Sequence, residues 1–182
     1  MKLRTSIIKI IKHGGVGVLP TDTLYGLVGP ARNPQTVERI YQLRQRPPSK
    51  PFIILINSLA DLKIFGVKLT PVTYNLLTNL WPGPVSVVLP CPLKKFYYLH
   101  RGKNTLAFRL PKPRWLRSLL KQTGPLIAPS ANLAGQPSAI NLREAKKYFG
   151  KQIDFYWPGG QLTGPASKLL TLKNGAVKII RT

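Results

Sequence analysis

The sequence predicts an α/β (α+β) fold, a single domain in which a twisted, mixed and largely parallel β-sheet is flanked by helices. Length is the first observation, because 182 residues fit one compact domain. Composition is the second, because 43% hydrophobic and 18% charged residues are typical of a folded protein. The third is the alternation of short apolar runs with segments of helical periodicity along the chain.

The N-terminal part predicts two helices, a strand and a loop. Residues 3–13 place isoleucines at helical spacing between lysines and end at a Gly-Gly pair, which predicts an amphipathic helix. The apolar run 16–20 ends at a proline and predicts a buried strand, whereas the polar, glycine-containing segment 21–29 predicts a loop. A second helix is expected over 34–44, because an asparagine suited to capping precedes a proline at the first helical position.

The middle of the chain continues this alternation. After a proline-rich turn, the continuous apolar run 52–56 suits a strand that is covered on both faces. Helices are expected at 58–65 and 70–80, and a Pro-Gly-Pro break then leads into a strand at 85–89. Residues 94–104 are basic and rich in aromatic side chains, and they predict a loop.

The C-terminal part predicts two more helices between short strands. A strand at 106–110 is followed by a helix at 114–122 and a short strand at 126–128. A further helix is expected at about 141–149, because apolar side chains recur there at helical spacing. Three short apolar segments then predict strands at 155–156, 169–172 and 177–181.

Basic residues far outnumber acidic ones. The chain has 28 Lys and Arg against 5 Asp and Glu, a formal net charge of +23. The chain therefore offers very few carboxylates for a catalytic carboxylate pair, or for a site in which protein side chains alone bind a hard metal ion. The single cysteine, Cys91, with His13 and His100 far apart in the sequence, cannot complete a standard zinc site. We expect anionic partners and no metal bound by the protein's side chains alone.

The sequence gives no sign of secretion or membrane insertion. One cysteine excludes an internal disulfide and suits a reducing compartment. No apolar run approaches the roughly 18 residues of a membrane-spanning helix, and lysines interrupt the N-terminal apolar segment. We therefore expect a soluble, cytoplasmic protein that has no membrane partner.

Polar residues gather where the predicted strands end. They include residues 21–23, the cations of 44–50, Arg109, residues 130–132 and residues 167–168. Crevices at strand ends are the usual ligand sites of open α/β sheets. The common glycine-rich nucleotide motifs and the serine-hydrolase elbow are absent from the sequence. The remaining hydroxyl, amide and guanidinium groups suit the positioning of an anionic substrate without a conventional base.

Five segments resemble the motifs of one family in the same order. They read PTDTLYGL at 20–27, RQRPPSKP at 44–51, WPGPVS at 81–86, LAFRLP at 106–111 and PSANLAGQPS at 129–138. These resemble the signatures of the YrdC/Sua5 family of L-threonylcarbamoyladenylate synthases. The resemblance covers 16–182 and implies a YrdC/RibB-like fold with a basic concave cleft. The length matches the short form, so we expect one YrdC-like domain over 1–182 and no additional C-terminal Sua5 domain.

The resemblance implies a nucleotidyl transfer. ATP, L-threonine and bicarbonate would yield threonylcarbamoyl-AMP and pyrophosphate, through a threonine carbamate whose oxygen attacks the α-phosphorus. The product would feed a downstream tRNA threonylcarbamoyl transferase complex that makes N6-threonylcarbamoyladenosine (t6A). Mg²⁺ would enter with ATP and be held mainly through the phosphates, so it would need few protein carboxylates.

The resemblance also assigns residues, position by position. Arg44 and Arg46 would be catalytic. Thr23 and Arg109 would hold the threonine, with Ala128 and Ser167 near it. The nucleotide and its phosphates would be surrounded by Arg44, Arg46, Lys50, Thr105, Ser130, Asn132, Ser138 and Arg181.

The chain departs from the family pattern at three places. Arg44 stands where the family usually has lysine, which keeps the charge but exchanges an ammonium for a wider fork. Ala134 replaces a serine and loses one hydroxyl. Near the C-terminus Ser167 is retained, but Lys168 follows it in place of the usual threonine.

Other interpretations stay open at this point. A non-catalytic module that binds double-stranded RNA or tRNA would also explain the charge and the aromatic, basic segment 94–104. Carbamoyl-adenylate chemistry like that of hydrogenase-maturation proteins is a third interpretation, although that domain normally lies within a much longer chain. Structural roles are expected for Asp22, as a turn residue, and for Trp81 and Trp157, as packing residues.

Overall fold

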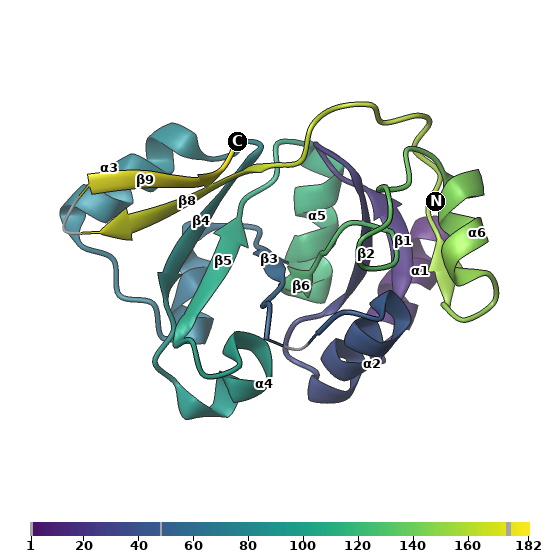
Figure 1. Ribbon diagram of the computed structural model, residues 1–182, viewed down its shortest axis with the longest axis horizontal. Coiled ribbons are helices and arrows are strands. Elements are labelled where there is room, and N and C mark those ends of the chain that lie inside the picture. Colours follow the sequence, from purple (N-terminus) through teal and green to yellow (C-terminus); the bar gives the residue numbers. More distant parts are fainter. Residues whose placement is uncertain (1, 48, 174–175) are drawn as a thin grey trace.

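One mixed sheet of nine strands organises the molecule (Figure 1). The computed structural model describes residues 2–47, 49–173 and 176–182. The strand order is β7-β1-β2-β6-β3-β5-β4-β8-β9. The strands are β1 (Gly17–Pro20), β2 (Tyr25–Pro30), β3 (Ile53–Leu55), β4 (Val85–Pro90), β5 (Thr105–Arg109), β6 (Leu126–Ile127), β7 (Phe155–Tyr156), β8 (Lys168–Lys173) and β9 (Ala176–Arg181).

The sheet is mixed, as predicted, but the prediction that it is largely parallel is wrong. Among the strand pairs of the described residues, β1–β7, β3–β5 and β4–β8 are parallel, and β1–β2, β2–β6, β3–β6, β4–β5 and β8–β9 are antiparallel. Continuous apolar runs are typical of parallel strands, because such strands are buried on both faces. Here both faces of the sheet are covered as well. Burial on both faces is compatible with either strand direction.

Strand β2 lies where the sequence predicted a loop. Its glycines suggested a turn, yet five of its six residues are buried. Gly29 is required by packing, because a Cβ atom there would lie 2.4 Å from Cγ2 of Thr36 on the neighbouring helix. The strand pairs with β1 as a hairpin, and residues 21–24 form the tight turn between the ends of the two strands.

The predicted helices are present, with two differences. The helices are α1 (Lys2–Lys12), α2 (Pro34–Arg44), η1 (Leu59–Phe65), α3 (Pro71–Leu80), η2 (Lys94–Phe96), α4 (Tyr97–His100), α5 (Arg114–Thr123) and α6 (Leu142–Phe149). The η1 segment is a 3₁₀ helix, and the predicted loop at 94–104 contains η2 and α4. Asn33 caps α2 as expected, since its side chain accepts a hydrogen bond from the Thr36 amide at 3.1 Å. Residue 48 of the proline-rich turn lies outside the described residues.

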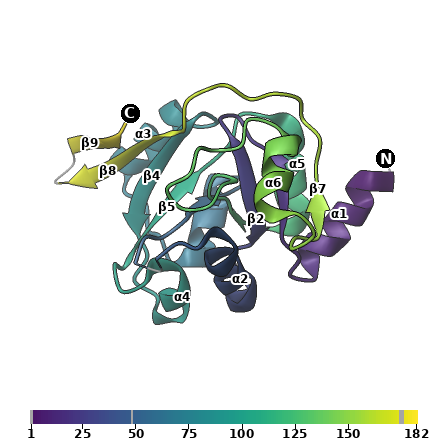
Figure 2. The same cartoon turned by 45° about the vertical axis from the view of Figure 1, so that its right-hand side comes forward.

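The two faces of the sheet are covered by different helices. Buried side chains alternate between two hydrophobic clusters, with Val18 in the larger and Leu19 in the smaller. The smaller cluster includes side chains of α1 and α5, whereas the larger includes side chains of α2, α3, α4 and α6. Helix α1 and the β8–β9 ribbon lie at opposite ends of the molecule (Figures 1 and 2). Within the described residues, no helix is long and apolar enough to cross a bilayer.

One carboxylate joins three elements near β7, and this arrangement predicts a pH effect. Asp154 accepts hydrogen bonds from the Val16 amide at 2.7 Å and from Nη1 of Arg39 at 2.7 Å. The bond from Arg39 is the main reason that the pKa of Asp154 lies below its usual value. The carboxylate therefore stabilises the fold above its unfolded-state pKa of about 3.9, and this stabilisation is lost as the pH falls through the lower folded-state pKa.

We expect Asp154→Asn to lower the free energy of unfolding by about 1 kcal/mol at neutral pH, because the pair is partly exposed to solvent. Urea denaturation of both proteins at several pH values measures the effect. The difference between them should shrink as the pH drops below about 4. A difference that stays constant down to acid pH would show that the charge of Asp154 contributes nothing.

Candidate functional site

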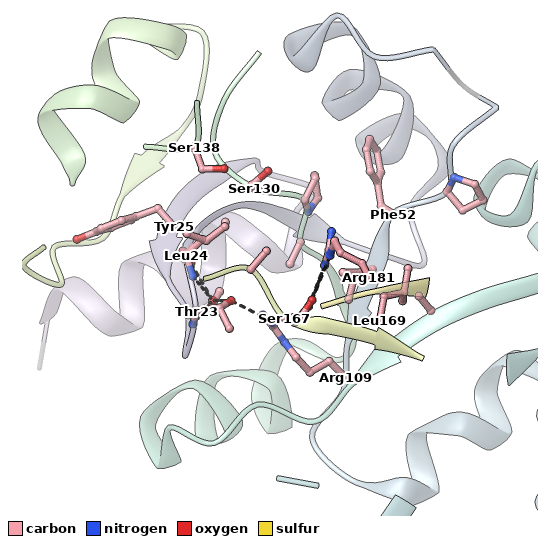
Figure 3. Close-up of a pocket in the computed structure, with 18 of the residues that line it drawn as sticks. Thr23, Leu24, Tyr25, Phe52, Arg109, Ser130, Ser138, Ser167, Leu169 and Arg181 are labelled. Carbon is pink, nitrogen blue, oxygen red and sulfur yellow. Dashed lines mark hydrogen bonds between the residues drawn. The ribbon is translucent and has the colours of Figure 1, made fainter. Parts of the chain in front are cut away.

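A pocket of about 290 Å³ opens over the strands that α1 and α5 leave uncovered. Ala107 and Arg109 of β5 line it, whereas Phe108 between them belongs to the larger hydrophobic cluster. The connection between β7 and β8 crosses the sheet and adds Ser167 to one wall (Figures 1 and 2). The predicted site residues that line the pocket are Thr23, Arg46, Arg109, Ala128, Ser130, Ser138, Ser167 and Arg181 (Figure 3). The sheet therefore gathers residues from the ends of several strands, as the sequence predicted.

Arg109 and Thr23 form the first group in the pocket. Arg109 is the last residue of β5, and its Nη1 donates to Oγ1 of Thr23 at 3.0 Å (Figure 3). Asp22 lies behind them, with Oδ1 3.5 Å from Nη2 of Arg109 and Oδ2 accepting from the Lys112 amide at 3.1 Å. The structural role expected for Asp22 is thus observed, but the same side chain also pairs with a pocket arginine. No pattern in the sequence connects residues 22 and 109.

Arg181 and Ser167 form the second group. Nη2 of Arg181 donates to the Ser167 carbonyl oxygen at 2.7 Å and to its hydroxyl oxygen at 3.2 Å (Figure 3). The Ser167 hydroxyl also lies 3.0 Å from the hydroxyl of Ser86, which is fully buried on β4. The sequence placed Ser167 with threonine and Arg181 with the nucleotide, whereas the structure joins them, so the two regions meet here. Ser86 was not predicted as a site residue, although it ends the WPGPVS motif.

Arg44 does not line the pocket, which differs from its predicted catalytic role. Its side chain is 3% exposed, with Nε donating to the Asn132 carbonyl at 2.9 Å and Nη2 to Asn132 Oδ1 at 3.1 Å. Nη2 also lies 3.5 Å from the Ser130 hydroxyl, which does line the pocket. Burial lowers the pKa of Arg44 to about 10, so it remains protonated at neutral pH. Arg44 and Asn132 therefore contact Ser130 from outside the pocket lining and help to position it.

Three further predicted residues also lie outside the pocket lining, namely Asn132, Lys50 and Thr105. Asn132 is buried and accepts the hydrogen bonds of Arg44. Lys50 is exposed, and its carbonyl oxygen accepts a hydrogen bond from the Tyr41 hydroxyl at 3.2 Å. Thr105 starts β5 and is separated from Arg109 by the length of the strand, about 13 Å at the usual rise per residue. The resemblance assigned Thr105 to the nucleotide site, whereas the structure places it at the far end of the strand that carries Arg109.

The pocket lining is cationic. Arg46, Arg109 and Arg181 contribute guanidinium groups, and none of the described residues in the lining is acidic. Burial lowers the pKa of Arg109, Asp22 opposes this effect, and the nearby charge of Arg181 adds to it. Burial also lowers the pKa of Arg46. Like charges held together in a half-enclosed site bind anions, because an anion relieves their mutual repulsion.

The remaining predicted structural residues pack as expected. Trp81 is buried, and its indole N–H donates to the Val85 carbonyl at 2.7 Å. Trp157 stacks on Trp115 of α5, with ring centroids 5.1 Å apart. Cys91 is buried in the larger hydrophobic cluster. Trp157 therefore fixes the start of the connection that forms one pocket wall.

The two hydrogen bonds from the Arg44 guanidinium to Asn132 lead to a stability prediction. We expect Arg44→Lys to lower the free energy of unfolding by about 1–2 kcal/mol, because one ammonium cannot reproduce both bonds to Asn132. Urea denaturation measures the change, and Arg114→Lys at an exposed position of α5 is the matched control. Equal stability of Arg44→Lys and the control would contradict the positioning role of this fork.

Fold and site together define a class of protein: a single mixed-sheet α/β domain with a pocket at its strand ends that is lined by three arginines. The chain belongs to the Sua5/YciO/YrdC family, whose model, described as "Telomere recombination", matches residues 9–182. A threonylcarbamoyl-AMP synthase of Nitrosococcus oceani is 34% identical over 161 residues, which cover 87% of each protein.

Solved structures agree with this membership. Sua5 of Pyrococcus abyssi, solved in complex with L-threonine, superposes with a TM-score of 0.90 at 29% identity over 99% of this chain. The match covers 53% of the Sua5 chain, so this chain spans about half the length of that protein. YciO of Escherichia coli superposes with a TM-score of 0.87 at 26% identity, covering 99% of this chain and 88% of YciO.

Proposed function

We propose that this protein is a threonylcarbamoyl-AMP synthase, a nucleotidyltransferase that forms L-threonylcarbamoyladenylate and pyrophosphate from L-threonine, bicarbonate or carbon dioxide, and ATP. One observation carries the proposal: Arg46, Arg109 and Arg181 meet in one pocket with no acidic side chain in its lining. ATP, bicarbonate and the carboxylate of threonine carry negative charge, and the repulsion between these groups must be overcome before they react. The relatives named for this activity and the threonine complex of Sua5 support the assignment.

The two arginine groups suit two parts of the reaction. Arg109 and Thr23 provide a fork and a hydroxyl, which suit the carboxylate of threonine. Arg46, Arg181, Ser130 and Ser138 provide cations and hydroxyls for the triphosphate. The threonine amine captures bicarbonate as a carbamate with loss of water. A carbamate oxygen then attacks the α-phosphorus as the bond to pyrophosphate breaks. Catalysis by positioning and charge neutralisation needs no carboxylate base.

We propose that Mg²⁺ accompanies ATP. Within the described residues, no three His, Cys, Asp or Glu side chains are grouped to hold a metal ion. Asp22 is engaged by Arg109 and the Lys112 amide, so it is not free to act as a ligand. The donor set fits an ion held mainly by phosphate oxygens and water, with the hydroxyls of Ser130 and Ser138 among the neutral oxygens of the pocket. When bound, Mg²⁺ would neutralise phosphate charge.

We propose that the product is consumed in the cytoplasm by a tRNA threonylcarbamoyl transferase complex, which makes t6A. A mixed carbamic-phosphoric anhydride is reactive toward amines and water. Its formation is therefore useful only where an acceptor amine, such as that of adenosine in tRNA, is supplied nearby.

Product analysis tests the enzyme directly. The protein is incubated with ATP, Mg²⁺, threonine and bicarbonate, and threonylcarbamoyl-AMP is measured by mass spectrometry. We expect the adenylate only when threonine and bicarbonate are both present. A folded protein that forms no adenylate, or one that forms it without threonine, would contradict the proposal.

A second candidate, contact with tRNA or double-stranded RNA, rests on a different observation. All five acidic side chains are engaged within the protein, in hydrogen bonds with backbone amides or in ion pairs with Arg39, Arg101 and Arg109. The lysines around α4 are therefore not neutralised by ion pairs within the described residues, and Tyr97 beside them is 62% exposed. We expect RNA affinity to fall steeply with salt if this surface binds phosphates. Affinity independent of salt and of Tyr97→Ala would contradict it.

A further inference from the structure

Tyr41, which no sequence motif singled out, contacts three points of the segment that carries Arg46 and Lys50. Its carbonyl oxygen accepts a hydrogen bond from the Arg46 amide at 3.1 Å. Its hydroxyl donates to the Lys50 carbonyl oxygen at 3.2 Å. Its ring stacks on Phe52, with centroids 4.1 Å apart and planes inclined by 26°. One buried residue in the last turn of α2 therefore contacts Arg46 through its backbone, and Lys50 and Phe52 through its side chain.

The stack continues on either side of this aromatic pair. The guanidinium carbon of Arg46 lies 5.3 Å from the Phe52 ring centroid, and Phe52 itself lines the pocket. On the other side, the guanidinium carbon of Arg101 lies 4.6 Å from the Tyr41 ring centroid. Arg101 is fixed in turn by an ion pair of 2.8 Å with Glu38 on α2. The Phe52 ring and the Arg101 guanidinium both lie in contact with the Tyr41 ring, and one face has no room for both. They therefore cover opposite faces of Tyr41.

Arg46 has few other restraints. Within the described residues it forms no ion pair, and its buried Nε has no hydrogen-bond partner. Arg46 follows Gln45. The φ of Gln45 is 51°, which lies in the left-handed region that residues with a Cβ rarely adopt. The helix thus ends in a sharp turn that directs the next residue toward the pocket. A guanidinium stacks favourably on an aromatic face, so the Phe52–Tyr41 pair provides a surface that orients it.

We propose that Tyr41 is a positioning residue for the polyphosphate site: through its contacts with the Lys50 carbonyl and the Phe52 ring, it orients Arg46 toward the phosphates of the substrate. Tyr41 does not itself line the pocket, so it acts through Arg46, which does. The identification of the anion as the triphosphate of ATP rests on the proposed function. The positioning of Arg46 by Tyr41 does not.

Binding of inorganic tripolyphosphate, measured by isothermal titration calorimetry, tests the proposal. We expect Tyr41→Leu, which removes the ring and the hydroxyl, to raise the Kd about tenfold, and Tyr41→Phe, which removes one hydrogen bond, about threefold. Tyr98→Phe is the matched control, because its part-buried hydroxyl likewise donates to a backbone carbonyl, that of Ala31, at 3.1 Å. We expect the control to bind as the wild type does.

A kinetic readout separates positioning from a loss of stability. The KM for ATP should rise in the Tyr41 variants while the KM for threonine stays unchanged. Arg109 and Thr23 bond to each other, and no hydrogen bond or ion pair joins them to the described residues 46, 47 and 49–52. If Tyr41→Leu does not fold, the comparison of Tyr41→Phe with Tyr98→Phe decides. Equal tripolyphosphate affinity of Tyr41→Phe and Tyr98→Phe would overturn the proposal. A wild-type protein that binds tripolyphosphate but forms no adenylate would overturn the proposed function alone.

Discussion

Replacing Arg46 with alanine should lower kcat/KM for threonylcarbamoyl-AMP formation about 10²–10³-fold, the cost typical of removing one preorganised donor that stabilises developing charge. Arg46 lines the pocket and carries no ion pair within the described residues, so its charge is available to the substrate. The phosphates gain negative charge on the departing pyrophosphate as the reaction proceeds. The effect should therefore appear in kcat as well as in KM for ATP.

Arg114→Ala is the matched control for this change. It removes the same charge from an exposed position on α5 that does not line the pocket. We expect its steady-state kinetics to stay within about twofold of the wild type, because distant exposed charges are largely screened at physiological ionic strength. Equal losses in the two variants would show that Arg46 acts only through the overall charge of the protein.

The second large effect is expected at Arg109. Replacing it with alanine should raise the KM for threonine about 100-fold, because a buried fork that binds a carboxylate contributes several hydrogen bonds and leaves an unpaired charge when removed. The side chain is 4% exposed and lies 3.5 Å from Asp22, so alanine would also leave that carboxylate without its cation. Steady-state kinetics at saturating ATP measure the effect.

Arg109→Lys keeps the charge beside Asp22 and protects the test against loss of folding. We expect a smaller increase in the KM for threonine, about tenfold, since an ammonium cannot contact Thr23 and a carboxylate in the geometry of the fork. The KM for ATP should change little in this variant. A selective increase in the KM for ATP would contradict the assignment of Arg109 to threonine.

The sequence predicts the helices of this fold better than the direction of its strands. Capping by Asn33 and the proline after it specify α2 locally, and the structure begins the helix at Pro34. Strand β2 could not be predicted, because the need for Gly29 within it arises from the approach of Thr36 on another element. Strand direction likewise depends on pairing between distant segments, which apolar runs do not encode.

Much the same division applies to the candidate site. Arg46, Arg109 and Arg181 come from three distant segments. The positions of strand ends and the family resemblance both predicted that Arg46 and Arg109 meet, and the resemblance alone added Arg181. The resemblance also assigned Arg44, but it could not show that the buried guanidinium donates to Asn132 from outside the pocket lining. The contact between Asp22 and Arg109 depends on the folded geometry of the β1–β2 turn, so no local sequence pattern predicts it.

Isotope exchange tests the central claim most directly. The protein is incubated with ATP, Mg²⁺ and labelled pyrophosphate, and the appearance of label in ATP is followed with and without threonine and bicarbonate. Reversible adenylyl transfer predicts exchange that requires both co-substrates and is lost in Arg46→Ala. Exchange without threonine, or no exchange by a folded protein that binds ATP, would contradict the account.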